Sequence, residues 1–226
     1  MKAIIVGSST FTLKLSEGQN IAYKIGKSFS NSPEIIARNA LELNSLTMEE
    51  INKIISSEIA IMQVGVFEFI PKLKRRFYPT LRVQHKNKFL YEIRVEKFPY
   101  VAKILNNYNR VLFITQLALN IGVQINDDAA LEIFCENLLE NPKSKLEYLF
   151  LLTSPPVAHP GSEDAIRKVD RILGTIADRY RNVILLDYNV LTKNLNHDRS
   201  GHLVSEDRGV FVRRVTDEIK QYKIDI

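Results

Sequence analysis

Residues Ile59-Ala60-Ile61-Met62-Gln63-Val64-Gly65-Val66 form the strongest strand signal in this chain. Their near-continuous apolar character predicts a strand that is covered on both faces, as the strands of parallel sheets are. Before and after them, shorter apolar runs predict four further strands, at residues 2–6, 21–25, 148–153 and 183–187.

Segments with a helical spacing of apolar residues separate these strands. A helix is expected from Pro33 onward, and another from the capping-box sequence Thr47-Met48-Glu49-Glu50 to about residue 56. Longer helices are expected at residues 127–139, 162–180 and 206–222. Strands that alternate with helices predict an α/β fold, in which a parallel five-stranded sheet carries helices on both faces.

The composition is that of an ordinary globular domain, with 226 residues of which 45% are hydrophobic and 25% charged. We therefore expect a single domain over residues 1–226. No apolar run approaches the roughly 18 residues of a membrane helix, so membrane insertion is not expected. The N-terminal apolar stretch is too short for a signal-peptide core, and it predicts a cytoplasmic protein.

Cysteine and histidine usage does not point to a metal site. Cys135 is the only cysteine, so neither an internal disulfide nor a cysteine metal site is expected, and its helical context favours a buried thiol. The four histidines, at positions 85, 159, 197 and 202, include no helical i, i+4 pair. The sequence therefore predicts no metal ion and no cofactor.

The segment from about residue 67 to 124 is longer than a crossover between strands requires, which predicts an inserted lid or subdomain. Between Pro71 and Lys97 it is rich in lysine and arginine, in a chain whose net charge is +5. This basic segment fits a solvated surface, a hairpin that pairs with a second subunit, or a site for an anionic glycan, phosphosugar or nucleic acid. Its interleaved aromatic residues occur in nucleic-acid binders too, but they also suit an ordinary strand, so nucleic acid is not favoured.

In an open α/β sheet, ligands bind beyond the carboxyl ends of the strands. The loops expected there carry hydroxyl, imidazole and carboxyl groups, the types needed for acyl transfer. These loops begin at Gly7-Ser8-Ser9-Thr10, Gly26-Lys27-Ser28, Gly65-Val66-Phe67-Glu68, Ser154-Pro155-Pro156 and Asn194.

The order of these motifs resembles the SGNH/GDSL hydrolase family, whose fold is a flavodoxin-like three-layer sandwich. The family's Gly-Asp-Ser turn after the first strand is Gly7-Ser8-Ser9 here, so Ser9 matches the nucleophile and Ser8 replaces the Asp. Its second block supplies an oxyanion-hole glycine, for which Gly26 is the nearest match. Its Gly-x-Asn-Asp block reads Gly65-Val66-Phe67-Glu68, so Phe67 stands at the oxyanion-hole Asn.

The family's last block, Asp-x-x-His, is matched by His202 with a departure. Arg199 stands three residues before the histidine, and Asp198 lies one residue further back. The chain also resembles a divergent branch of SGNH-like proteins from bacterial capsule and surface-polysaccharide gene clusters. That branch carries a Gly-x-x-Asp-x-x-Pro-Arg-like block, which residues 65–72 echo.

The resemblance implies a serine esterase or O-acyltransferase acting on an acylated carbohydrate. Ser9 would attack the ester carbonyl, His202 would act as base and then acid, and Asp198 would orient the imidazole. The N–H groups of Ser9, Gly26 and Gly65 would form the oxyanion hole. Substrate contacts are expected from Ser8, Glu68, Lys72, Arg75 and Arg76.

Two other functions stay open at this stage. Because Phe67 cannot donate a hydrogen bond, catalysis should be slow unless another donor such as Lys27 or Ser28 replaces the Asn. A degenerate site that binds a glycan or an assembly partner without turnover is therefore the main alternative. A phosphate- or nucleotide-binding module fits less well, because the sequence has neither a Gly-x-Gly-x-x-Gly fingerprint nor a complete P-loop motif.

Overall fold

The computed structural model divides the chain into two compact units, residues 1–69 with 127–226 and residues 70–126. It describes residues 1–7, 11, 20–38, 41, 43–63, 72–73, 111, 123–124, 129–155, 162–197 and 203–222. The first unit contains the sheet and the helices that pack on it, and the second is described only at a few positions.

The first unit is built on a five-stranded sheet with the order β2-β1-β3-β6-β7. All four neighbouring pairs are parallel. This is the flavodoxin-like order, and it confirms the predicted α/β class and number of strands. The strands are β1 (Ala3–Gly7), β2 (Glu34–Ala37), β3 (Ile59–Gln63), β6 (Tyr148–Leu152) and β7 (Val183–Leu186).

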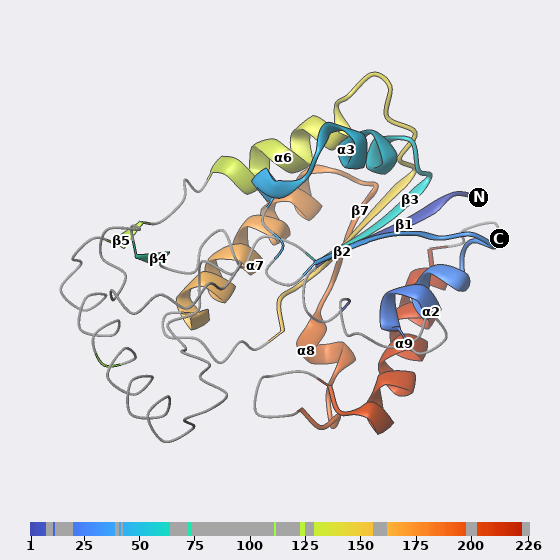
Figure 1. The fold of residues 1–226 in the computed structure, drawn as a ribbon, viewed down its shortest axis with the longest axis vertical. Coiled ribbons are helices and arrows are strands. Elements are labelled where there is room, and N and C mark those ends of the chain that lie inside the picture. Colours follow the sequence, from blue (N-terminus) through green and yellow to red (C-terminus); the bar gives the residue numbers. More distant parts are fainter. Residues whose placement is uncertain are drawn as a thin grey trace, which may run out of the picture. The chain divides into compact units, whose positions relative to one another are not determined.

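Helices cover both faces of this sheet (Figure 1). One face carries α2 (Ile21–Lys27) and α9 (Ser205–Lys220). The other carries α3 (Met48–Ile55), α6 (Ala129–Leu139) and α7 (Ser162–Arg179). The short elements η2 (Leu43–Ser45) and α8 (Tyr188–Leu191) lie in connections.

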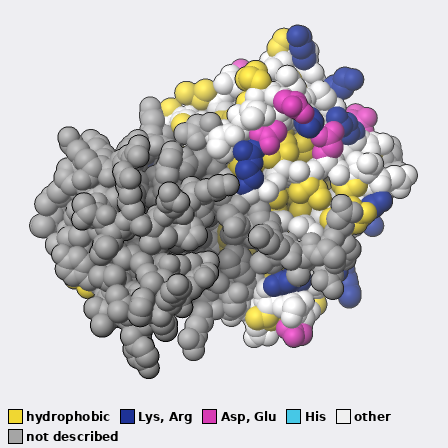
Figure 2. Space-filling view, in the orientation of Figure 1, with side chains coloured by type: hydrophobic (Ala, Val, Ile, Leu, Met, Phe, Trp, Pro, Cys, Tyr) yellow, Lys and Arg dark blue, Asp and Glu magenta, His cyan; other side chains and the backbone are white. Residues whose placement is uncertain are grey.

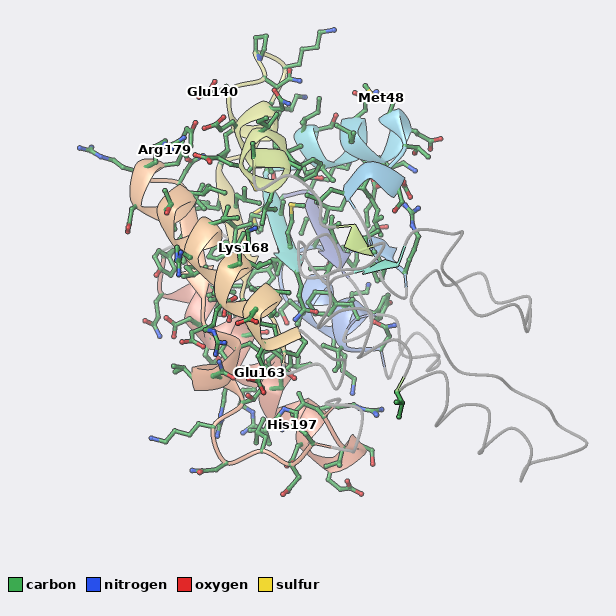
Figure 3. The ribbon with its side chains drawn as sticks, turned by 90° about the vertical axis from the view of Figure 1, so that its left-hand side faces the viewer. Met48, Glu140, Glu163, Lys168, Arg179 and His197 are labelled. Carbon is green, nitrogen blue, oxygen red and sulfur yellow. The ribbon has the colours of Figure 1, made fainter. Side chains whose placement is uncertain are left out.

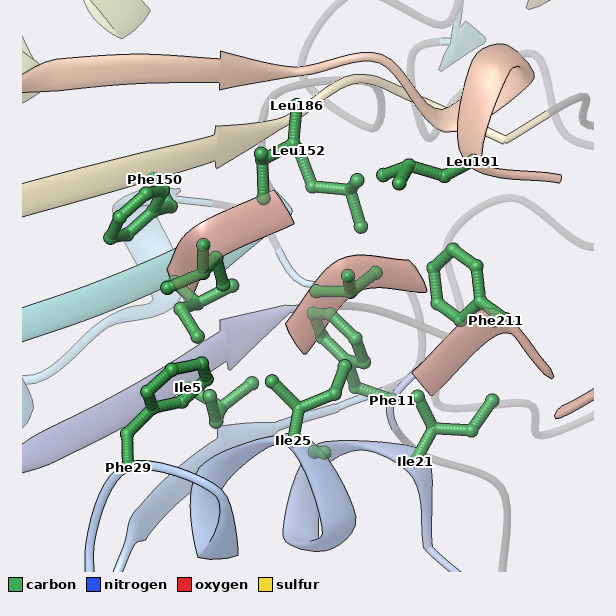
Figure 4. Close-up of a cluster of buried hydrophobic side chains, with 14 of the residues drawn as sticks. Ile5, Phe11, Ile21, Ile25, Phe29, Phe150, Leu152, Leu186, Leu191 and Phe211 are labelled. Carbon is green, nitrogen blue, oxygen red and sulfur yellow. The ribbon is translucent and has the colours of Figure 1, made fainter. Parts of the chain in front are cut away.

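The core between the sheet and the α2/α9 layer is entirely apolar at its centre (Figure 4). Phe150, in the middle of β6, is 0% exposed and stacks on Tyr148 with ring centroids 6.1 Å apart. Tyr222, just beyond α9, meets the Phe150 ring edge-on at 5.8 Å. The burial of such aromatic side chains contributes more to the stability of the fold, per residue, than the burial of most other core side chains.

Several sequence predictions are confirmed. All residues of β3 are buried, as expected for a strand covered on both faces. The capping box at α3 is present, because Thr47 accepts from the Glu50 N–H and Glu50 accepts from the Thr47 N–H. Cys135 is fully buried in α6, and that burial raises the pKa of its thiol to about 12, so it behaves as a small apolar side chain.

The prediction of a strand at residues 21–25 is wrong, because this segment is helix α2. Its buried residues, Ile21, Ala22, Ile25 and Gly26, follow a helical spacing that a short apolar run can hide. The Asn20 side chain accepts from the Tyr23 N–H and so caps the helix.

The helix expected from Pro33 is also wrong, because residues 34–37 form strand β2. The β-branched pair Ile35-Ile36 suits an extended backbone, and Pro33 precedes the strand, where its missing N–H costs no ladder bond. Pairing with the free edge of β1 decides the outcome, since it supplies backbone partners from Ile4 to Gly7.

The second unit contains one short antiparallel ladder among its described residues. Strand β4 (Lys72–Leu73) pairs with β5 (Val123–Gln124), with Lys72 opposite Gln124. This ladder joins residues that lie about fifty positions apart along the chain. Apart from Val111, the rest of the predicted insert at 67–124 lies outside the described residues, and its role as a lid stays a prediction.

The described surface carries both signs of charge, interspersed in the view of Figure 2. Arg179 on α7 pairs with Glu132 at 2.7 Å and also with Glu136, both on α6, and Tyr180 donates to Glu140 at 2.6 Å. Figure 3 shows this α6–α7 contact near Glu140 and Arg179, at the end of the unit opposite His197. In the part of the chain that is described, no helix has the length and apolarity needed to span a membrane.

Candidate active site

The carboxyl ends of β1 and β3 meet at the point where the strand order reverses. From β1, the chain passes to β2 on one side and later to β3 on the other, and ligands bind at such switch points. Gly7 is the last residue of β1, and in the register it pairs with Ala37 of β2 and Gln63 of β3. The segment that follows Gly7 therefore begins at the middle of the carboxyl edge of the sheet.

Gly7 and Phe11, which flank residues 8–10, pack against each other. A Cβ on Gly7 would lie 2.3 Å from Phe11 Cδ2, so the aromatic ring occupies the space that a side chain at position 7 would need. Phe11 is 1% exposed, and its carbonyl accepts from Asn20 Nδ2 at 3.1 Å. The two described residues that flank positions 8–10 are thus held together at the end of β1.

Gln63 is a buried polar side chain at the same place. It is 3% exposed, and among the described residues neither its Oε1 nor its Nε2 has a hydrogen-bond partner. Leaving a buried donor or acceptor unpaired costs about 1–3 kcal/mol. Such a group is rare in a native structure and calls for a physical explanation.

Polar groups at the carboxyl ends of β6 and β7 are joined by hydrogen bonds. Tyr188 donates its N–H to Thr153 Oγ1 at 2.8 Å, and Ser154 donates its N–H to Asp170 Oδ1 at 3.4 Å. Burial raises the pKa of Asp170, and the charge of Asp187 adds to this, while the bond from Ser154 opposes it. These bonds fix the start of the loop that follows β6.

The loop before α9 is closed at its base. His197 and Leu203 form an antiparallel bridge, and Val204 donates its N–H to the Asn196 carbonyl at 3.1 Å. The ring nitrogen Nε2 of His197 lies 3.4 Å from the Tyr188 hydroxyl, whose pKa is raised by burial.

Leu203 is 2% exposed and belongs to the same buried cluster as Phe11. The residue after His202 is therefore anchored on the α2/α9 side of the sheet.

Most of the predicted site residues lie outside the described part of the chain. This holds for the predicted catalytic residues, for one oxyanion-hole residue and for most substrate contacts: Ser9, Asp198, His202, Gly65, Ser8, Glu68, Arg75 and Arg76. It also holds for Phe67 and Arg199, which depart from the family pattern. Lys72 is described only as part of the β4–β5 ladder. What the structure brings together are the chain neighbours of Ser9 and His202, namely Gly7, Phe11 and Leu203.

The prediction for Gly26 is wrong. Gly26 is the sixth residue of α2, so its N–H belongs to the hydrogen-bond ladder of the helix and is not free for an oxyanion. It is a glycine for packing reasons, because a Cβ there would lie 2.5 Å from Pro33 Cβ.

The two substitute donors considered near Gly26 are engaged as well. Lys27 Nζ donates to the Asn31 carbonyl at 2.5 Å, and Ser28 Oγ donates to the Lys24 carbonyl at 3.2 Å. Both residues stand at the C-terminal end of α2, whereas the Gly-Lys-Ser of a P-loop opens a helix.

Sequence reasoning missed Gln63 and Tyr188. Gln63 had a signal, since it is the one polar residue in an otherwise apolar run. Tyr188 had none, because its contacts with Thr153 and His197 arise only in the folded chain. Within the described ranges, no three His, Cys, Asp or Glu side chains are grouped so that they could hold a metal ion.

Comparison with known proteins identifies the fold. No protein-family profile and no curated protein sequence matches this chain. A protein described as lipolytic, of the G-D-S-L family, from Desulfitobacterium hafniense DCB-2 is similar in structure, with a TM-score of 0.53 and 11% identity. The alignment covers 96% of this chain and 98% of that one.

Two similar structures belong to carbohydrate-modifying proteins. The catalytic domain of Streptococcus pneumoniae peptidoglycan O-acetyltransferase A aligns with a TM-score of 0.51 at 6% identity, over 98% of this chain and 94% of that domain. A family two carbohydrate esterase from Clostridium thermocellum, in complex with cellohexaose, aligns with a TM-score of 0.52 at 11% identity. The alignment covers 98% of this chain but only 64% of that longer one. Together with the strand order, these likenesses show that this chain has the fold of the SGNH/GDSL hydrolases.

Proposed function

We propose that this protein is an SGNH-type serine esterase or O-acyltransferase that acts on an acylated carbohydrate. The observation that carries the proposal is that Leu203 belongs to the same buried cluster as Phe11, which packs on Gly7 at the carboxyl edge of the sheet. Ser9 lies two residues from Phe11 and His202 lies one residue from Leu203. Because consecutive Cα atoms are about 3.8 Å apart, both proposed catalytic residues are expected at this edge.

The His197–Leu203 bridge supports Asp198 as the partner of His202. An antiparallel register that pairs 197 with 203, continued by one residue, would set position 198 opposite position 202. Directly opposed residues have Cβ atoms about 4.5–5.5 Å apart, within reach of a carboxylate–imidazole hydrogen bond. With this register, Asp198 would take the role that the family's Asp-x-x-His spacing gives to position 199, which is Arg199 here.

The proposed reaction proceeds through an acyl-serine. Ser9 Oγ attacks the ester carbonyl carbon while its proton passes to the His202 ring, leaving a negative charge on the carbonyl oxygen. Collapse of this tetrahedral intermediate expels the sugar alcohol, which takes the proton from His202. A water molecule then releases a carboxylic acid, or a second sugar hydroxyl accepts the acyl group, and Ser9 is regenerated in either case.

The basic segment of the insert supports an acylated carbohydrate as the substrate class. Aromatic faces suit sugar rings, and Lys or Arg suits the carboxylate or phosphate groups of an anionic glycan. The proposed substrate contacts are Ser8, Glu68, Lys72, Arg75 and Arg76. The carbohydrate esterase and the peptidoglycan O-acetyltransferase among the similar structures agree with this class. Bacterial surface-polysaccharide metabolism is the context we propose.

Replacing Lys74, Arg75 and Arg76 with alanine is expected to weaken binding of an anionic glycan about 10-fold at low ionic strength, since each exposed ion pair contributes modestly. The loss should shrink in high salt, where screening already removes the contribution. Isothermal titration with a polyuronic oligosaccharide at two salt concentrations measures both effects.

The matched control removes the same charge elsewhere. Lys143, Lys145 and Arg181 are exposed and lie in connections that enter β6 and β7 at the opposite end of the sheet. Their triple alanine variant should bind as the wild type does. Equal binding by both triple variants, with a changed oligomeric state of the first, would instead assign the basic segment to a subunit interface.

A covalent probe tests the proposed function itself. A fluorophosphonate reacts only with an activated serine, so incubation should add one phosphonyl group to the peptide that contains Ser9, as detected by mass spectrometry. An acetylated oligosaccharide should slow this labelling and be deacetylated. Absence of both labelling and turnover would overturn the proposal.

Binding without turnover is the second candidate function, and Phe67 is the observation that favours it. An oxyanion hole that loses one donor typically loses about 10²–10³ in rate. Under this second function, the acylated glycan would bind with measurable affinity while neither labelling of Ser9 nor deacylation occurs.

A further inference from the structure

Gln63 is the residue whose environment the proposed mechanism leaves unexplained. It ends β3 at the switch point, and its amide is buried without a hydrogen-bond partner among the described residues. The other residues of β3 on the same face, Ile59 and Ile61, are apolar members of the core under α2 and α9. The amide at the end of this row departs from the apolar pattern of the strand.

The position of Gln63 ties it to the proposed nucleophile. Its Cα pairs with that of Gly7, and its Cβ lies 3.4 Å from the point where a Gly7 Cβ would stand. Gln63 thus lies beside the contact between Gly7 and Phe11, on the same face of the sheet. The residue after His202, Leu203, packs into the cluster on this same face.

Two of the donors that the family resemblance implies for the oxyanion hole are missing in this chain. Gly26 has its N–H in the α2 ladder, and Phe67 stands where the family has a donor side chain. The backbone N–H groups of Ser9 and Gly65 would remain. A preorganised donor in a site that excludes water is what stabilises a developing oxyanion most effectively.

We propose that the Gln63 side-chain amide is a further donor to the oxyanion, carried by β3 four residues before Phe67. Its Nε2–H bonds the acyl oxygen of the substrate as negative charge develops there. Among the described residues the amide has no partner, and under this proposal its partner arrives with the substrate. This inference rests on the proposed function and deepens it.

The test replaces Gln63 with Met, which keeps the length of the side chain and removes the donor. We expect kcat for a short-chain aryl ester to fall about 10²-fold with little change in KM, because the interaction exists only in the transition state. The midpoint of urea unfolding should stay the same or rise, since an unpaired buried amide is removed. Gln63→Asn, which keeps an amide on a shorter stem, should recover part of the lost kcat.

Ile61→Met is the matched control, because Ile61 lies on the same strand and face two residues earlier and is 0% exposed. It perturbs the same core without touching a donor, and its kcat should stay within about twofold of wild type. An active wild type whose Gln63→Met variant keeps its kcat would overturn this inference and leave the esterase intact. A wild type that shows neither labelling of Ser9 nor turnover would overturn the proposed function instead.

Discussion

Replacing either Ser9 or His202 with alanine is expected to lower kcat for hydrolysis of a short-chain aryl ester by at least about 10³-fold. Without the Ser9 hydroxyl no acyl-serine can form. Without the His202 imidazole the alcohol is not deprotonated and remains a weak nucleophile at neutral pH. Steady-state hydrolysis assays on the purified variants measure the loss, and unfolding curves check that the fold is retained.

The two residues act as one unit, so their effects should not add. The double variant is expected to be no slower than the slower single variant. Ser56→Ala is a suitable control, because Ser56 is an exposed residue that caps α3 at the opposite end of the sheet. Activity that survives in both single variants would remove Ser9 and His202 from the mechanism.

Phe150→Ala is expected to destabilise the first unit by about 3–5 kcal/mol, the range found for buried aromatic residues truncated to alanine. Phe150 lies in the middle of β6, is completely buried, and contacts the rings of Tyr148 and Tyr222. Its removal leaves a cavity between the sheet and α9 that the surrounding backbone cannot close. Urea denaturation followed by circular dichroism measures the change in the free energy of unfolding.

A substitution at an exposed position is the control for this prediction. Ile133 on α6 is 51% exposed, so Ile133→Ala should change the free energy of unfolding by no more than about 0.5 kcal/mol. A loss of similar size in both variants would mean that the core described around Phe150 is not what holds this unit together.

Elements whose sequence signals are long or chemically specific could be predicted correctly. The apolar run at 59–66 gave a fully buried β3, and the apolar stripe over residues 162–180 gave α7 (Ser162–Arg179). The capping box fixed the start of α3 at Met48. In each case the local pattern and the tertiary environment favour the same structure, so no longer-range information was needed.

For the candidate site, the sequence placed the motifs at the carboxyl edge but could not identify which groups are free to act. Gly26 matches the family's oxyanion-hole glycine in residue type and in its order along the chain. Its N–H, however, is used in the hydrogen bonding of helix α2. Gln63 is one polar residue in an apolar strand, and only its burial with no partner in the described part of the chain marks it as a candidate donor. Hydrogen-bond satisfaction depends on neighbours that are remote in sequence.

The conformation between Asn20 and Ala37 depends on tertiary contacts that the local sequence does not reveal. Residues 21–25 and 34–37 are both short apolar runs, for which periodicity does not distinguish a strand from a helix. The first became α2 because its Ile21 and Ile25 side chains fill the space under α9 in the shared core. The second became β2 because the edge of β1 offered a ladder of backbone partners. Segments this short take the conformation that buries their apolar side and pairs their backbone, and only the assembled sheet supplies both.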